Sequence, residues 1–126
     1  MITEDYCSFE VAKLLKEKGF DEGCNSYFIS DNEIALISNR RDFNNHGVYL
    51  SAPTHQMAMK WLREVHKIGI FPNTYTFVNG DNKSIVYGTA IVNLTTHELM
   101  INDIMERDAY EEAVEAALKY SLKNLI

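Results

Sequence analysis

One amphipathic stretch, residues 53 to 68, constrains the fold of this 126-residue chain more than any other. Its apolar side chains recur at helical spacing and fall within an arc of about 140°. They are Met57, Ala58, Trp61, Leu62 and Val65. Pro53 pushes the residue before it toward extended geometry, and the hydroxyl of Thr54 can cap the first turn. We therefore expect a helix over about 54–67 that buries Trp61 against a core.

A shorter helix is predicted over about 8–18. Ser8 is its expected N-cap, because a serine oxygen accepts a backbone N–H that the helix leaves unpaired. Gly19 supplies the left-handed residue that ends the helix. We expect Phe20 to fold back onto its apolar face.

The rest of the first 107 residues alternates β-prone runs with turn residues. The expected strands lie at 27–30, 34–38, 48–51, 68–78 and 85–92. Asn79 and Gly80 open a turn, so residues 74–92 are expected to form a hairpin. Pro72 is compatible with a strand only at a sheet edge or a bulge. Residues 95–106 fit neither the helical nor the strand period, so both a strand and a short helix are open there.

The C-terminal helix is predicted over about 108–125. Asp108 and Glu111 can form a capping box, and Glu115 and Lys119 are one turn apart on the expected outer face. We expect this helix to pack on the sheet beside the central helix.

These elements predict one α+β domain over residues 1–126. Short connections between consecutive strands favour a mainly antiparallel sheet of four to six short strands, with the three helices packed on it. A chain of this length buries roughly two-thirds of its unfolded surface, so it needs no metal or disulfide to fold.

Composition limits the classes of function. With 46% hydrophobic and 24% charged residues and no apolar run of roughly 20 residues, the chain resembles soluble proteins and no membrane span is expected. The acidic N-terminus lacks the features of a signal peptide, so we expect a cytoplasmic protein. Cys7 and Cys24 lack metal-binding spacing and are expected to be free thiols. The net charge of −6 argues against non-specific nucleic-acid binding.

The histidines follow no recognisable catalytic or metal-binding pattern. His46 has no Ser, Cys or carboxylate partner at a catalytic spacing. His55 and His66 are about three turns apart, too far for a metal pair at i and i+4. The remaining loose cluster consists of His97, Glu98 and Asp103. We therefore expect no metal and no cofactor, and we assign no catalytic residue.

Three basic residues form a narrow stripe opposite the apolar face of the central helix. They are Lys60, Arg63 and Lys67. Such a stripe is usually a solvated helix face, but it also suits contact with an acidic partner or a phosphate. The last thirty residues hold seven acidic and three basic residues, a net charge of −4 out of −6. Opposite patches on one small chain suit self-association, so a homodimer or a contact with another protein is expected.

The three helical segments carry a resemblance to a known group of proteins. They are SFEVAKLLKEKGFD at 8–21, APTHQMAMKWLRE at 52–64 and YEEAVEAALKYSLKNLI at 110–126. In this order they resemble small uncharacterised proteins of Bacteroides-group bacteria and their phages. The resemblance implies a prophage or another mobile element as context. It implies no activity and no catalytic residues, and it does not extend to residues 22–50 and 68–107.

Two classes of function are consistent with these observations. The first is a non-enzymatic protein-interaction module of a mobile element, acting through its surface and forming a homodimer. The alternative is a small enzyme or ligand-binding domain with its site in loops 39–47 and 94–107. A deep pocket with a pKa-shifted histidine or carboxylate would favour the alternative, and a flat apolar or charge-complementary surface would favour the module.

Overall fold

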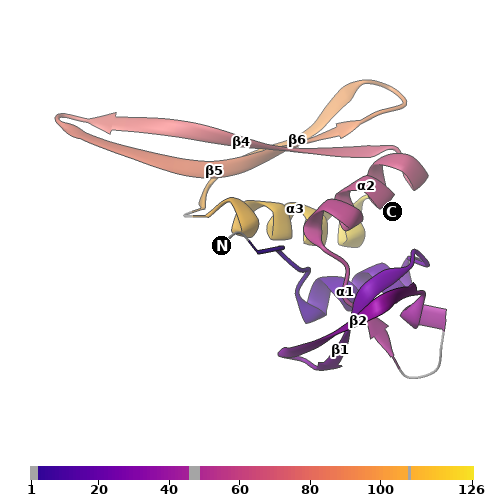
Figure 1. The fold of residues 1–126 in the computed structure, drawn as a ribbon. Coiled ribbons are helices and arrows are strands. Elements are labelled where there is room, and N and C mark those ends of the chain that lie inside the picture. Colours follow the sequence, from indigo (N-terminus) through magenta and orange to yellow (C-terminus); the bar gives the residue numbers. More distant parts are fainter. Residues whose placement is uncertain (1–2, 46–48, 108) are drawn as a thin grey trace.

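The described part of the chain folds into two antiparallel three-stranded sheets and three α-helices (Figure 1). The computed structural model describes residues 3–45, 49–107 and 109–126, with the backbone alone for 102–107. The elements are α1 (Phe9–Glu17), β1 (Cys24–Ser30), β2 (Glu33–Arg41), the 3₁₀ helix η1 (Phe43–Asn45), β3 (Leu50–Ser51), α2 (His55–Val65), β4 (Ile68–Asn79), β5 (Asn82–Asn93), β6 (Glu98–Arg107) and α3 (Tyr110–Asn124). None of the described helices is both long and apolar enough to cross a bilayer.

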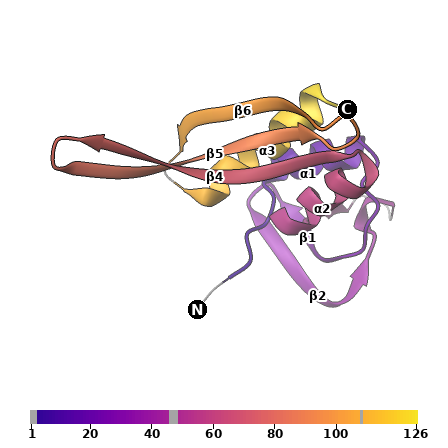
Figure 2. The same ribbon diagram turned by 90° about the horizontal axis from the view of Figure 1, so that it is seen from above.

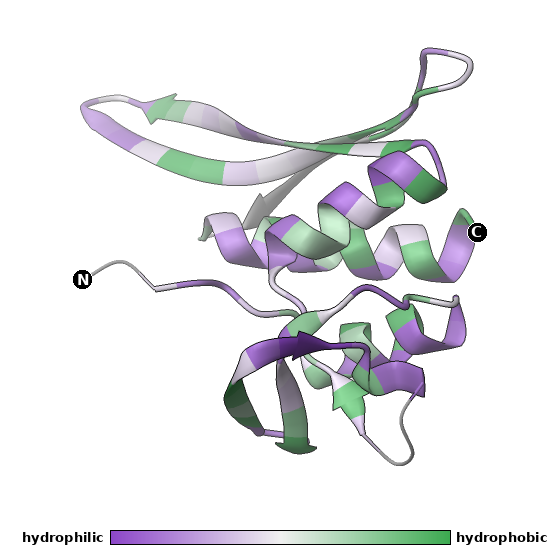
Figure 3. Cartoon of the chain, turned by 45° about the vertical axis from the view of Figure 1, so that its right-hand side comes forward, coloured by the Kyte–Doolittle hydropathy of each residue, from purple (hydrophilic) through white to green (hydrophobic). Residues whose placement is uncertain are grey.

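The larger sheet has the strand order β4-β5-β6 and is covered on one face by helices. α3 contacts β4 and β5, and α2 contacts β4 and α3. Ile68, Ile70 and Ile91 point into this layer and are buried with Trp61 and the apolar face of α3. The opposite face of the sheet has no helix on it within the described chain (Figures 1 and 3).

The smaller sheet has the order β2-β1-β3 and lies on the other side of the helices, next to α1. A second apolar cluster joins it to α1, with Ala12, Phe28, Leu50 and Ala52 buried together. The Phe9 and Phe28 rings meet edge to face, with centroids 5.3 Å apart. Because α1 also contacts α3, this half of the molecule is attached to the larger sheet through the helices.

The α+β class, the antiparallel pairing and the three helices are confirmed. The Thr54 hydroxyl accepts the Met57 N–H at 3.2 Å, and the Ser8 hydroxyl accepts that of Val11 at 3.1 Å. Trp61 is 5% exposed, and its ring lies 5.5 Å from that of Phe20. Both predicted caps and the predicted burial are therefore correct.

Two side chains of the central helix are placed differently from the prediction. Val65 is 55% exposed, although it lies within the expected apolar arc. Met59 is not among the residues of that arc, yet it is buried. Neighbouring layers cover α2 on more than one side, so a single-arc prediction misplaces residues at its borders.

The strands differ from the prediction in length and grouping. They form two sheets instead of one, and β4 and β5 have twelve residues each, so they are not short. Residues 98–106 of the ambiguous segment belong to the strand β6. Pro72 lies on the edge strand β4, whose register with β5 has no bulge.

The start of the C-terminal helix also differs. α3 begins at Tyr110, and its N-cap is Ala109, which makes no side-chain cap. Asp108, half of the predicted capping box, lies outside the described residues.

Candidate functional site

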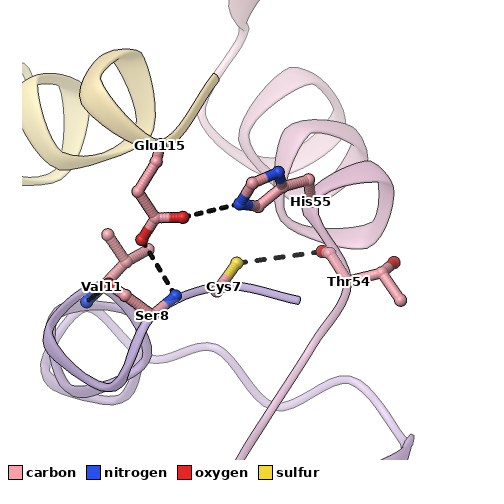
Figure 4. Close-up of polar contacts among 6 residues, drawn as sticks. All are labelled: Cys7, Ser8, Val11, Thr54, His55 and Glu115. Atoms are coloured by element: carbon pink, nitrogen blue, oxygen red, sulfur yellow. Dashed lines mark hydrogen bonds and ion pairs between the residues drawn. The ribbon is translucent and has the colours of Figure 1, made fainter. Parts of the chain in front are cut away.

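The chain segment before α1 meets the start of α2 and the middle of α3 at a polar junction (Figure 4). The Cys7 N–H donates to the Pro53 carbonyl at 2.9 Å, and the His55 N–H donates to the Asp5 carbonyl at 2.8 Å. These bonds hold the N-terminal segment alongside the entry to α2.

A histidine–carboxylate pair forms the centre of this junction. His55 is buried, and its Nε2 lies 2.5 Å from Glu115 Oε2. Glu115 Oε1 accepts the Ser8 backbone N–H at 2.9 Å. The predicted outer pairing of Glu115 with Lys119 is therefore wrong, and Lys119 Nζ instead lies 3.0 Å from Glu10 Oε1.

The Glu115 carboxylate is held in its ionised form. Burial raises its pKa, but the hydrogen bonds from His55 and Ser8 more than offset this, so the pKa is lowered. Because an ionised carboxylate only accepts hydrogen bonds, His55 donates from Nε2. Its Nδ1 is buried and has no hydrogen-bond partner among the described residues.

Cys7 lies beside this pair, so the junction contains the residue types of a thiol hydrolase. Its geometry argues against that chemistry. Burial raises the Cys7 pKa well above its ordinary value, whereas a nucleophile needs the thiolate. The thiol points at the Thr54 carbonyl, 3.8 Å from Sγ, and the second ring nitrogen of His55 lies on the side away from Cys7 (Figure 4). The junction therefore ties three segments together.

The predicted basic stripe is exposed on the outer side of α2. Lys60 Nζ is 3.9 Å from Glu64 Oε1, and Lys67 Nζ donates to the Glu64 carbonyl at 2.9 Å. Lys67 lies beyond the C-cap His66, with φ 58°. The Glu64 carboxylate therefore offsets the charge of Lys60 alone, because the contact of Lys67 is with an uncharged backbone carbonyl.

The other histidines show no grouping that suggests chemistry. His66 packs against Trp61, with ring centroids 4.7 Å apart. His97 lies in the turn between β5 and β6, while the Asp103 side chain and all of His46 lie outside the described part of the chain. Within that described part, no group of three or more His, Cys, Asp or Glu could hold a metal ion.

Parts of both loops of the enzyme alternative are strands. Residues 39–41 belong to β2, and residues 98–107 form β6. A cavity of about 250 Å³ beside η1 is lined by the Tyr27, Phe43 and Tyr49 rings, and no described residue of 94–107 lines it.

A larger groove of about 860 Å³ runs between α1 and α3. Several carboxylates line it, including Glu10, Glu111 and Glu112. Glu10 is paired with Lys119 and lies 3.6 Å from Lys123, so opposite charges already occupy this surface. No buried, unpartnered polar side chain is among its lining residues.

The hairpin expected over residues 74–92 is present, but the sequence does not indicate that its outer part projects from the larger sheet as an arm (Figure 2). β6 pairs with β5 from Tyr87 to Asn93, so residues 75–86, which we call the arm, form a two-stranded hairpin. Three of its apolar side chains are about half or more exposed. They are Phe77 (47%), Val78 (63%) and Ile85 (60%).

Within the described chain, β4 is an edge strand along both the base of the hairpin and the arm, because only β5 pairs with it. All twelve residues from Ile68 to Asn79 are uncharged, in a chain with 24% charged residues. On the face away from the helices, Phe71 and Leu99 are also exposed. The lack of charge is visible in the sequence, but the free edge is not.

Comparisons with protein-family models, with curated proteins and with solved structures found no match to this chain.

Proposed function

We propose that this protein is a non-enzymatic interaction module that self-associates through its larger sheet. The observation that carries the proposal is the free edge of β4, which is long, regular and uncharged. Exposed edges of this kind pair readily with other strands, and most native edge strands are guarded against such pairing. The resemblance of the helical segments supports a role as an accessory protein of a prophage or another mobile element, acting in the cytoplasm.

The surroundings of the edge support the same role. An isolated two-stranded hairpin is marginally stable in water, so an arm of this length gains stability from a partner. The apolar side chains of the arm and of the outer sheet face supply area for such a contact. The polar junction, with its protonated buried thiol, supports a structural role in place of catalysis.

Light scattering after gel filtration, over a range of protein concentrations, tests the proposal. We expect a mass that rises toward two chains with concentration. Thr76→Lys, which places a charge on the exposed edge, should keep the chain monomeric without changing its circular dichroism.

Thr95→Lys is the matched control, because Thr95 is an exposed threonine in the β5–β6 turn, away from the β4 edge. It should associate like the wild type. A mass of one chain at every accessible concentration of the wild type would refute the proposed function.

A further inference from the structure

The free edges of the two sheets differ in their protection against added strands. Native edges usually carry charges or bulges, or are very short. β3 has only two residues, β2 contains charged residues and register shifts, and so does β6. Among the edges that the structure describes, β4 alone is long, regular and uncharged, and Pro72 is its one interruption.

The turn at the tip determines which backbone groups of β4 face outward. Gly80, with φ 63°, is first in the two-residue connection, the glycine position of a type II′ turn. The flanking pair Asn79–Asn82 is then hydrogen-bonded, and such pairs recur at every second residue. The other residues direct their N–H and C=O groups away from β5. Near the tip, these outward-facing residues are Thr74, Thr76 and Val78.

We propose that the occupant of this edge is β4 of a second copy, paired antiparallel about a twofold axis at Thr76; this inference rests on the proposed function. Thr76 then faces its own counterpart, and Thr74 faces Val78 of the second copy. On the other face of the strand, Tyr75 stands opposite Phe77 of the second copy. Every pair joins two β-branched or two aromatic residues, which are favourable cross-strand pairs.

Pro72 selects this register. It belongs to the outward-facing set, so its missing N–H breaks no hydrogen bond within the hairpin but offers none to an added strand. An axis at Thr74 or at Tyr75 would place Pro72 inside the pairing. The axis at Thr76 gives the longest pairing that excludes it, with residues 74–78 of both copies exchanging backbone hydrogen bonds.

Charge does not oppose a second copy at this edge. The chain carries a net charge of −6, so two copies repel each other over most approaches. β4 has no charged residue, and the edge-to-edge approach therefore brings no like charges together. A strand pairing of this length buries less area than a standard protein interface, so the dimer should form and dissociate with concentration.

Disulfide trapping tests the register. In a hydrogen-bonded antiparallel pair the Cα atoms are about 5.5 Å apart, within the range of a disulfide. Thr76→Cys should therefore form a covalent dimer under mild oxidation, seen on a non-reducing gel. Val78→Cys is the matched control, because the two Val78 Cα atoms would be about 14 Å apart. A mixture of Thr74→Cys and Val78→Cys should form the mixed covalent dimer.

The wild type, whose Cys7 and Cys24 are both free and buried, controls for background oxidation. Equal trapping of Val78→Cys and Thr76→Cys would refute the Thr76 axis. No trapping of any variant, with a wild type that still forms dimers by light scattering, would refute β4 pairing but leave self-association standing. A wild type that stays monomeric would refute both.

Discussion

The two ends of the β4–β5 hairpin have the same backbone pairing but opposite environments. At the base, Ile70 pairs with Ile91, and they are 7% and 1% exposed. Six residues along β4 and on the same face, Thr76 pairs with Ile85, which is 60% exposed. The strand register is uninterrupted between the two pairs, so strand geometry does not cause the difference.

The difference in exposure arises because the helix layer covers only the base of the hairpin. Tyr110, the first residue of α3, packs edge to face against Tyr87 at 6.3 Å between ring centroids. β6 also ends its pairing with β5 at Tyr87. Beyond this point neither a described helix nor a third strand accompanies the hairpin (Figure 2). The same apolar pattern therefore builds the core at the base and an open surface on the arm.

The largest loss of stability is expected from a substitution in the core beneath the base of the β4–β5 hairpin. Trp61→Ala should destabilise the fold by on the order of 3 to 5 kcal/mol, because it leaves a large cavity among buried apolar residues. Urea unfolding followed by circular dichroism measures the loss. Native tryptophan emission close to that of free indole in water would contradict the burial of Trp61.

The hairpin itself offers a matched pair of substitutions. Ile91→Ala should cost about 2 to 5 kcal/mol, because its side chain is fully buried in the core. Ile85→Ala removes the same atoms on the arm and should change stability by no more than about 0.5 kcal/mol. Both are measured by urea unfolding at protein concentrations low enough to keep the chain monomeric. Equal costs would show that the arm is packed in solution.

The polar junction should make the stability of the fold depend on pH. The folded-state pKa of Glu115 is lowered from 4.5, so its stabilising contribution is present above that pH and is lost as the pH falls through the lowered pKa. Glu115→Gln should cost about 1 to 2 kcal/mol near neutral pH and less in acid. Urea midpoints at several pH values measure this difference. Glu10 has a lowered pKa too, so Glu10→Gln is the control, and an identical pH profile for both variants would contradict the role given to Glu115.

The smallest effect, here on self-association, is expected from substitutions in the basic stripe. An uncharged β4 interface predicts that Lys60→Glu combined with Arg63→Glu leaves the light-scattering mass unchanged, and that added salt hardly loosens the dimer. If the double variant dissociates and salt weakens the wild-type dimer, the stripe on α2 is the contact surface and β4 is not.

The elements whose signals are local could be predicted from the amino-acid sequence. The caps at Ser8 and Thr54 depend on side chains within three residues, and both are present in the structure. The apolar spacing around Trp61 likewise predicted the central helix. The turn that opens at Asn79 and Gly80 predicted the longest hairpin.

The contacts between these elements could not be predicted in the same way. Glu115 was expected to pair within its own helix, but α1 and α2 bring Ser8 and His55 to it from distant parts of the chain. The exposure of Ile85 and the free edge of β4 depend on where α3 begins and where β6 ends its pairing. Such relations are set by packing between segments far apart in the sequence, and periodicity within one segment carries no information about them.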